Sequence, residues 1–370
     1  MRTFLRRLGT ALLFLLVGLC FAPSVVPPFL DRIYYRGAPS GHFDGAHFFN
    51  PEDRLRPPRA TPPARFFNRW LTGDGRARWP ERVPVTPTVP PAWVEGRTML
   101  VTWIGHSTVL VQTGGLNILT DPIWSERASP FAFAGPKRVR APGVRFADLP
   151  RIDLVLVSHN HYDHMDVATL KRLWERDRPL IVTSLGNDAI LRGAGIPART
   201  GDWGHTVAGP WRGCAREIDP CLPARVEVTV ERVHHWGSRW GVDRNRALWS
   251  GFTVRLPGGN LFFAGDTGWG DGSWPAEAAK DGPYRLAILP IGAYLPREVM
   301  QPSHMNPSEA VAAFRRLGAR TALGVHWGTF QLTFEAIDDP PRRLAAALAA
   351  QGIPADRFVA TEVGRTFAVP

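Results

Sequence analysis

Cysteine is scarce in this chain, which has 3 cysteines, Cys20, Cys214 and Cys221, among 370 residues. None of them stands beside a cluster of other metal-binding side chains, so the cysteine-rich closed site typical of structural zinc is not indicated. Blocks rich in Lys and Arg are also missing, and the sequence therefore predicts no dedicated nucleic-acid tract. No internal repeat is evident.

The charge of the chain is positive and spread along its length. Lys and Arg together number 44 against 33 for Asp and Glu, which gives a formal net charge of +11. This balance suits an anionic partner such as a phospholipid head group, a phosphodiester or nucleic acid, although a coding bias toward arginine would leave the same composition. Hydrophobic residues make up 44% of the chain, enough for one large core.

Three histidines and an aspartate crowd one short loop, residues 159–164 (HNHYDH), directly after the apolar run 154–157. Imidazole and carboxylate ligands suit a borderline ion such as Zn²⁺, and this spacing can direct side chains toward two neighbouring metal positions. The alternative is a polar surface loop with unrelated histidines. Three imidazoles with a carboxylate between them favour a metal site, with two metals expected.

One loop cannot complete two coordination shells, so further ligands must come from distant segments. Three other apolar segments each end at a residue able to bind metal. They are 226–233, followed by His234 and His235; 260–264, followed by Gly265 and Asp266; and 321–325, followed by His326. Open α/β sheets keep their chemistry where strands open into loops, and all these candidates stand at such positions.

The chain resembles the metallo-β-lactamase superfamily and, within it, the zinc-dependent N-acylphosphatidylethanolamine phospholipase D group with its bacterial relatives. The resemblance covers about residues 99–370. It rests on segments 103–108 (WIGHST), 159–164 (HNHYDH), 235–236 (HW), 263–268 (FAGDTG), 290–294 (PIGAY) and 326–330 (HWGTF). The HNHYDH loop alone specifies only the superfamily, and the last three segments indicate the group. The resemblance implies an α/β protein with the four-layer αββα metallo-β-lactamase sandwich.

The resemblance also implies a ligand set for two zinc ions. His159, His161 and His235 correspond to the ligands of the first ion, Asp163, His164 and His326 to those of the second, and Asp266 to the bridging ligand. The best-known class of true β-lactamases has a cysteine at the bridging position, so aspartate there disfavours antibiotic hydrolysis.

Two points about the histidines stay open at this stage. By strand alternation His234 shares a face with the valines of segment 226–230, which favours His234, whereas the resemblance favours His235. His106 and His304 lie in family-like segments without a ligand role. We expect both beside the cleft, where they would orient a metal ligand or contact the substrate. His304 is the catalytic candidate and His106 the substrate-binding candidate, with a structural role as the alternative for His106.

The expected chemistry follows from the ligand set. Two zinc ions about 3.5–4 Å apart can share a water, lower its pKa toward about 7 and leave no need for a Ser or Cys nucleophile. Asp163 and Asp266 would be catalytic through the metals. The predicted activity is hydrolysis of a phosphodiester in an N-acylphosphatidylethanolamine-type phospholipid. Alternatives are hydrolysis of another ester, such as a sugar-phosphate lactone, or a non-catalytic interaction protein that only binds metal.

The N-terminal 98 residues differ from the rest. Residues 1–30 have arginines at positions 2, 6 and 7, followed by the uncharged apolar stretch 8–30, which predicts an uncleaved signal anchor rather than a cleavable signal. A catalytic domain over 99–370 would then lie on the extracytoplasmic, periplasmic side of the membrane. For Cys214 and Cys221, a disulfide and two buried thiols remain equally open.

Residues 31–98 are rich in Pro, Arg and aromatic side chains and have no sustained periodicity. We expect an irregular arm that wraps the catalytic domain, because a disordered tether would carry fewer aromatics. Its expected anchors are Phe48, Phe49, Phe66, Phe67 and Trp70.

Two helices are predicted over the catalytic domain. After Asp166, the spacing of Val167, Leu170, Leu173 and Trp174 indicates a helix packed on a sheet. The segment 306–309 (NPSE) has the pattern of a helix start, with Asn as cap, Pro in the first turn and Glu three residues after the cap.

Overall fold

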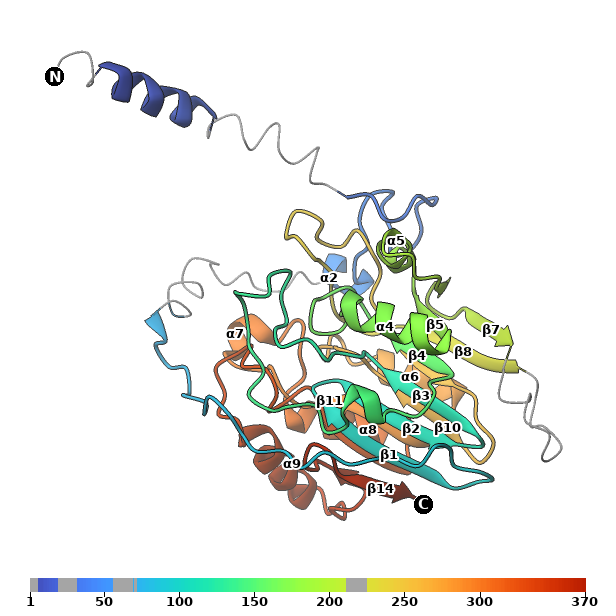
Figure 1. Ribbon diagram of the computed structural model, residues 1–370. Helices are drawn as coiled ribbons and strands as arrows, with labels where there is room; N and C mark the ends of the chain where they lie inside the picture. Colours follow the sequence, from blue (N-terminus) through green and yellow to red (C-terminus); the bar gives the residue numbers. More distant parts are fainter. Residues whose placement is uncertain (1–5, 19–31, 56–68, 70–71, 211–224) are drawn as a thin grey trace.

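The computed structural model describes residues 6–18, 32–55, 69, 72–210 and 225–370, and two seven-stranded sheets form its centre (Figure 1). The first sheet contains, in spatial order, β14 (Thr366–Val369), β1 (Met99–Gly105), β2 (Thr108–Thr113), β3 (Leu116–Thr120), β4 (Leu154–Val157), β5 (Leu180–Ser184) and β6 (Arg199–Gly201). The second contains β13 (Phe358–Val359), β12 (Thr321–Val325), β11 (Tyr284–Pro290), β10 (Asn260–Phe263), β9 (Gly251–Val254), β8 (Arg225–Glu231) and β7 (Thr206–Pro210).

The two sheets share one pairing pattern. In the first, β14, β1, β2 and β3 pair antiparallel, and β3 through β6 pair parallel. In the second, β7 through β10 pair antiparallel, and β10 through β13 pair parallel. Parallel strands that are buried on both faces read as continuous apolar runs, which explains the sequences LVLV of β4 and TALGV of β12.

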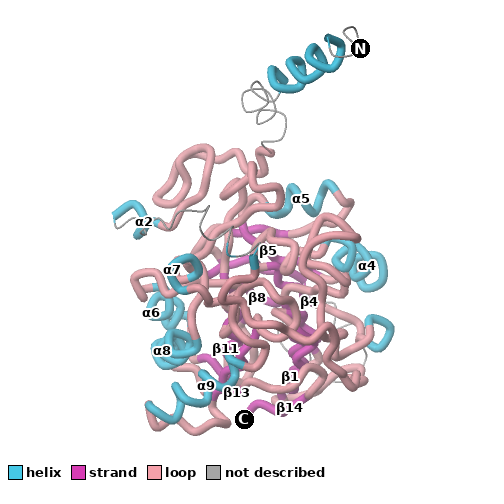
Figure 2. The backbone as a smooth tube through the Cα atoms, turned by 90° about the vertical axis from the view of Figure 1, so that its left-hand side faces the viewer, coloured by secondary structure: helices cyan, strands magenta, loops and turns pink. Residues whose placement is uncertain are grey.

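Helices cover the outer faces of the two sheets (Figure 2). The described helices are α2 (Pro51–Leu55), α4 (Val167–Asp177), α5 (Asn187–Gly193), α6 (Trp274–Ala278), α7 (Arg297–Met300), α8 (Pro307–Leu317), α9 (Asp339–Ala350), the 3-10 turns Phe146–Asp148 and Ala279–Asp281, and an N-terminal helix over residues 6–18. Helices α4 and α5 lie on one side, and α6, α8 and α9 lie on the other.

The core confirms a four-layer order. Along β4, Leu154 and Leu156 join the cluster between the sheets, whereas Val155 and Val157 join the cluster beneath α4. Successive side chains of a strand point to opposite faces, so this division means that both faces of the first sheet are buried. The architecture is the αββα sandwich that the sequence resemblance implied.

The predicted elements are found with small changes at their ends. Helix α4 begins after Asp166, whose side chain accepts a hydrogen bond from the Thr169 N–H, and α8 begins with a complete capping box between Asn306 and Glu309. Strands β4 and β12 have the predicted bounds, and β10 stops one residue earlier than expected. Strand β8 ends at Glu231, so regular alternation does not extend to His234.

The described parts of the N-terminal arm, 32–55 and 72–98, lie against the rest of the chain. Phe48 is 1% exposed in the main core, as expected of an anchor, and Phe43 joins it there. Phe49 is half-buried. The other expected anchors, Phe66, Phe67 and Trp70, lie outside the described residues, as do Cys20, Cys214 and Cys221.

The expected membrane anchor over residues 1–30 falls only in part on described residues. Residues 6–18 form a helix with exposed side chains, whereas residues 1–5 and 19–30 lie outside the described ranges. Within the described part of the chain, no helix has both the length and the apolar content needed to cross a bilayer.

Glu231, at the end of β8, is a carboxyl group in the core with 5% of its surface exposed. Burial raises the pKa of Glu231 from 4.5 to about 7, and the Thr253 hydroxyl that donates to its Oε1 offsets only part of this effect. A carboxyl whose pKa is higher in the folded state favours folding at low pH. That contribution is complete below pH 4.5 and is lost as the pH rises through about 7.

We therefore expect Glu231→Gln to remove a pH-dependent loss of stability on the order of 3 kcal/mol between pH 4.5 and 8. The amide keeps an oxygen for Thr253 and cannot ionise. Urea unfolding at several pH values gives the measurement, and Glu227→Gln, at an exposed carboxylate of the same strand, is the control. An unchanged slope of unfolding free energy against pH in Glu231→Gln would contradict this assignment.

Candidate metal centre

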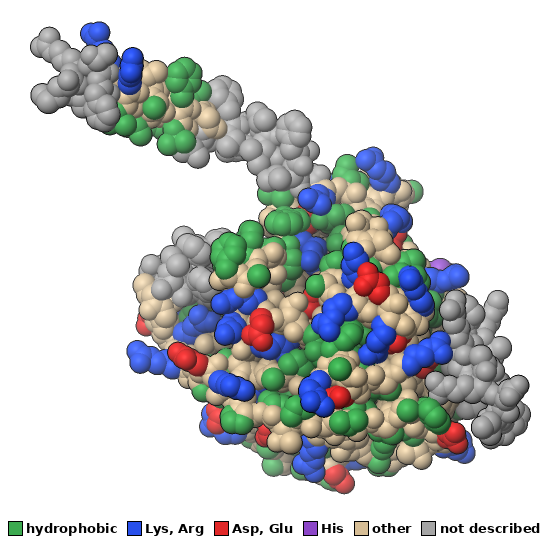
Figure 3. Space-filling model, in the orientation of Figure 1, with side chains coloured by type: hydrophobic (Ala, Val, Ile, Leu, Met, Phe, Trp, Pro, Cys, Tyr) green, Lys and Arg blue, Asp and Glu red, His purple; other side chains and the backbone are tan. Residues whose placement is uncertain are grey.

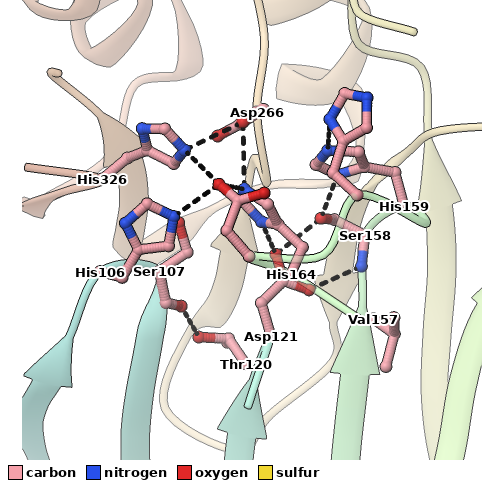
Figure 4. A network of polar contacts seen from close by, with 12 residues as sticks. His106, Ser107, Thr120, Asp121, Val157, Ser158, His159, His164, Asp266 and His326 are labelled. Carbon is pink, nitrogen blue, oxygen red and sulfur yellow. Dashed lines mark hydrogen bonds and ion pairs between the residues drawn. The ribbon is translucent and has the colours of Figure 1, made fainter. Parts of the chain in front are cut away.

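The predicted metal-binding residues meet at one edge of the two sheets. Loop 159–164 follows β4, His235 follows β8, Asp266 follows β10 and His326 follows β12. These four loops come from both sheets, so the site lies where the sheets meet at the ends of their strands (Figure 4). Strand ends in buried sheets supply rigid starting points for ligands, as the sequence pattern indicated.

Backbone conformation at two positions allows the loops to approach closely. Gly265 has a φ of +60°, and a Cβ placed on it would lie 2.4 Å from the Ser158 Cβ. A larger residue at 265 would therefore push Asp266 away from the loop after β4. His326 also has a positive φ, 63°, and its N–H donates to the His106 carbonyl at 3.0 Å.

One group of ligands consists of His159, His161 and His235, the three residues assigned to the first metal. Each offers a nitrogen within 4.8 Å of the others. The His159 Nε2 lies 2.7 Å from the His161 Nδ1, and the His235 Nε2 lies 3.5 Å from that same Nδ1. The structure places His235 in this group, whereas the His234 imidazole contacts Glu52, with Nδ1 at 2.6 Å from Oε1.

The second group contains Asp163, His164 and His326, the residues assigned to the second metal, together with His106. The Asp163 Oδ2 lies 3.3 Å from the His164 Nε2 and 3.4 Å from the His326 Nε2. The His106 Nε2 is closer still, at 2.8 Å from the same oxygen. His106 therefore contacts a predicted ligand directly and is buried, with 1% of its surface exposed.

Asp266 lies between the two groups, as a bridging residue should. Its Oδ2 is 3.1 Å from the His164 Nε2, 3.1 Å from the His326 Nε2 and 3.8 Å from the His235 Nε2. Figure 4 shows its carboxylate facing His326 and His164.

The donor atoms fit a bound cation. The Asp266 Oδ1 is buried and has no hydrogen-bond partner among the residues that the structure describes. The Nε2 atoms of His164 and His326 lie 3.1–3.4 Å from carboxylate oxygens of Asp163 and Asp266. Buried polar atoms without partners are costly, and a coordinated metal ion satisfies them without a proton. Nitrogen and oxygen donors without sulfur suit zinc or a similar divalent ion.

Electrostatics keep most of the imidazoles neutral. Burial lowers the pKa of His161 to about 4, of His235 to about 3 and that of His159 well below its usual range. A neutral imidazole is the form that binds metal. These three histidines are therefore ready to act as ligands at neutral pH.

The carboxylates and the two remaining histidines behave differently. Burial alone would raise the pKa of Asp163 and Asp266, but the neighbouring histidines hold both well below the usual range. For His326, burial is outweighed by Asp266 and Asp163, and its pKa rises to about 9; the pKa of His164 is raised well above its usual value by the same carboxylates and Asp121. Without metal, protons on these two histidines offset the negative charge of the buried carboxylates. A bound cation would offset that charge in their place.

His304 lies beside the two donor groups and is 8% exposed. Its ring centroid is 5.2 Å from that of His235 and 5.4 Å from that of His326. With His235 and Asp266 it forms another group of donors close enough to share an ion. Burial lowers the pKa of His304 well below its usual value, so the side chain is a neutral imidazole at neutral pH.

Sequence reasoning missed Asp121, which directly follows β3. Its Oδ2 accepts from the Ser158 hydroxyl at 2.6 Å and lies 2.6 Å from the His164 Nδ1, while its Oδ1 accepts from the Ser158 N–H. Asp121 is fully buried beneath the loop after β4 (Figure 4). A carboxylate on the far nitrogen of a metal-binding histidine fixes its tautomer and orientation. The same rule of polar residues after apolar strands would have found it.

Comparisons with known proteins agree with this geometry. The model of the family described as "Beta-lactamase superfamily domain" matches residues 116–327. A Caenorhabditis elegans protein named N-acyl-phosphatidylethanolamine-hydrolyzing phospholipase D 1 is 37% identical over 275 residues, which are 72% of this chain and 74% of that protein. A mitochondrial Saccharomyces cerevisiae protein with the corresponding name is 33% identical over 268 residues, 72% of this chain and 55% of that protein.

Among solved structures, the isothiocyanate hydrolase from Delia radicum gut bacteria superposes with a TM-score of 0.56 at 20% sequence identity, covering 73% of this chain and 99% of that one. At this identity the likeness concerns the fold alone. The sequence relatives and the family match also identify the family and the general activity. The chain belongs to the metallo-β-lactamase superfamily, in the group that resembles N-acyl-phosphatidylethanolamine-hydrolyzing phospholipase D, and it is a metal-dependent hydrolase.

Proposed function

We propose that this hydrolase binds two zinc ions and cleaves a phosphodiester bond in phospholipids of the N-acylphosphatidylethanolamine type. The observation that carries the proposal is the division of seven His and Asp side chains into two donor groups with Asp266 between them. The name of the C. elegans relative supports the substrate class.

The first zinc ion would be held by His159, His161 and His235, the second by Asp163, His164 and His326, with Asp266 shared. Zinc pairs supply Lewis acidity and an activated water at neutral pH. The protein's own side chains orient the ligands and neutralise the positive charge of the ions. Asp163 and Asp266 stay charged at the centre, and Asp121 fixes the orientation of the His164 ring.

His304 and His106 have separate proposed roles. His304, buried and neutral beside His235, can donate or accept a hydrogen bond at a substrate oxygen. The Nε2–H of His106 donates to Asp163, which supports a role in orienting that ligand, one of the two roles expected of His106. Dispersed Lys and Arg over the face seen in Figure 3 suit an anionic lipid surface.

The two-metal proposal makes a direct prediction. Zinc-saturated protein should hold two ions per chain, and His161→Ala or Asp266→Ala should lower turnover to background while the circular dichroism spectrum is retained. Each substitution removes a donor from a loop and leaves the core strands intact. Metal content by mass spectrometry together with activity tests this, and one ion or none in saturated protein would contradict the two-metal centre.

The substrate proposal predicts the products. Vesicles that contain N-acylphosphatidylethanolamine should yield phosphatidic acid and free N-acylethanolamine, because a phospholipase D-type cleavage breaks the bond on the head-group side of phosphorus. Lipid mass spectrometry measures both, with His161→Ala as the inactive control. If the protein cleaved a generic phosphodiester but no phospholipid of a panel, the phospholipid substrate would be rejected, whereas the assignment as a hydrolase would stand.

We also propose that residues 1–30 attach the protein to a membrane, with the catalytic domain on the extracytoplasmic, periplasmic side. The uncharged stretch 8–30 behind basic residues supports this. The exposed aromatic side chains Phe131, Phe133 and Trp240, 50%, 81% and 48% accessible, suit contact with a lipid interface.

This proposal predicts that the full chain sediments with membranes and resists carbonate extraction, whereas a chain beginning near residue 31 stays in solution and still cleaves dispersed phosphodiesters. Fractionation followed by N-terminal sequencing measures the outcome. A mature chain that starts near Pro23 and is free in solution would instead indicate a secreted enzyme.

A further inference from the structure

A short segment of the N-terminal arm, residues 48–53, contacts the chain on both sides of His235. This segment lies outside residues 116–327, the range that matches the superfamily model. It includes Asn50 and the start of α2, and it contacts the residues that follow β8.

Asn50 bonds directly to the backbone of a predicted metal ligand. Its side chain is 8% exposed, and its Nδ2 donates to the His235 carbonyl at 3.0 Å. Its Oδ1 accepts from the Trp249 Nε1, which also donates to the Val233 carbonyl. One amide therefore ties the chain on either side of His234 to the core.

The two carboxylates of α2 hold the neighbouring histidine. The Glu52 Oε1 lies 2.6 Å from the His234 Nδ1, and the Asp53 Oδ1 lies 3.4 Å from the His234 Nε2. The Glu52 Oε2 pairs with Arg232 at 3.2 Å. Both nitrogens of His234 thus face the arm and are directed away from the metal centre.

The loop that carries Asp266 also fixes the backbone at His234. The Thr267 hydroxyl accepts from the His234 N–H at 3.0 Å, and the Gly268 N–H donates to the His234 carbonyl at 2.7 Å. Gly270 passes so close to His234 that a Cβ there would lie 2.6 Å from its Nδ1. His234 is therefore clamped between the arm and the loop that carries Asp266.

Adjacent residues of an extended segment point in opposite directions. His234 forms an isolated antiparallel bridge with Gly268, and while its side chain is held against the arm, the next side chain, His235, points to the metal centre, where its Nε2 lies 3.5 Å from the His161 Nδ1. The choice between two neighbouring histidines, which the sequence left open, is thus made by contacts from a segment about 180 positions earlier in the chain.

We propose that Asn50 and Glu52 are positioning residues of the metal centre, which set the register of the His234–His235 pair and so hold His235 at the first metal position. This inference rests on the proposed two-metal function. Asn50 and Glu52 belong to the arm and act through His235 and His234. They do not contact metal or substrate themselves.

The test is zinc retention in the full chain. Protein saturated with zinc is dialysed against graded chelator, and zinc per chain and the melting temperature are measured for the parent, Glu52→Ala, Asn50→Asp and Asn50→Ala. We expect these variants to lose one of the two ions at about 10–100-fold lower chelator than the parent, the usual scale for partners of metal ligands. Asp74→Asn, at an exposed carboxylate of the same arm, is the matched control.

Two further variants separate positioning from stability. Glu52→Gln keeps an acceptor for His234 and should restore most of the zinc retention lost in Glu52→Ala. Because Glu52 acts through His234, Glu52→Ala should add little to the effect of His234→Ala in a double-mutant cycle.

The possible outcomes are distinct. A parent with two zinc ions and variants with unchanged retention would overturn this inference alone, as would loss of both ions in proportion to a fall in melting temperature. A parent with fewer than two ions would overturn the proposed function and this inference with it.

Discussion

Two buried carboxylates, Asp163 and Asp266, impose the main constraint on this structure. Each stays charged although it is buried, and buried charge is tolerated only when positive charge or hydrogen-bond donors surround it. Imidazoles of His164 and His326 supply that compensation at 3.1–3.4 Å. The loops that carry these groups must therefore come together. A divalent cation can replace the protons on the histidines and bind the same carboxylate oxygens and imidazole nitrogens. The charge of the two buried carboxylates is thus compensated either by protonated histidines or by a bound cation.

The sandwich is suited to holding such a site because its strands are fixed on both faces. Residues of β4 pack alternately into the inter-sheet core and against α4. The end of β4 is therefore held in place, and it gives the short loop that follows a fixed starting point. Gly265 permits the approach of the β10 loop, and Asp121 joins β3 to the loop after β4 through Ser158 and His164. Loop geometry of this kind allows one fold to serve many hydrolyses, and the substrate is decided by residues at the rim.

The N-terminal arm also helps to hold the site in place. Asn50 and Glu52 contact the strand end from outside the sandwich, and Phe48 fixes them by its burial in the core. A segment without regular periodicity can therefore take a defined position when its side chains pair with distant parts of the chain. Its aromatic content was the only sign of this order in the sequence.

Local patterns in the sequence predicted the strands that end at the site, the capped start of α8 and the candidate metal-binding residues, because each depends on an apolar run, a cap, or a polar residue just after a strand. The resemblance to a known family implied the fold class and the grouping of the candidate ligands. Only the tertiary structure decided between His234 and His235, brought His106 to Asp163 and placed Asp121 beneath His164. Strand β8 ends before His234, so alternation could not be extended to it. These outcomes depend on hydrogen bonds between segments 37 to 185 positions apart, which no local periodicity records.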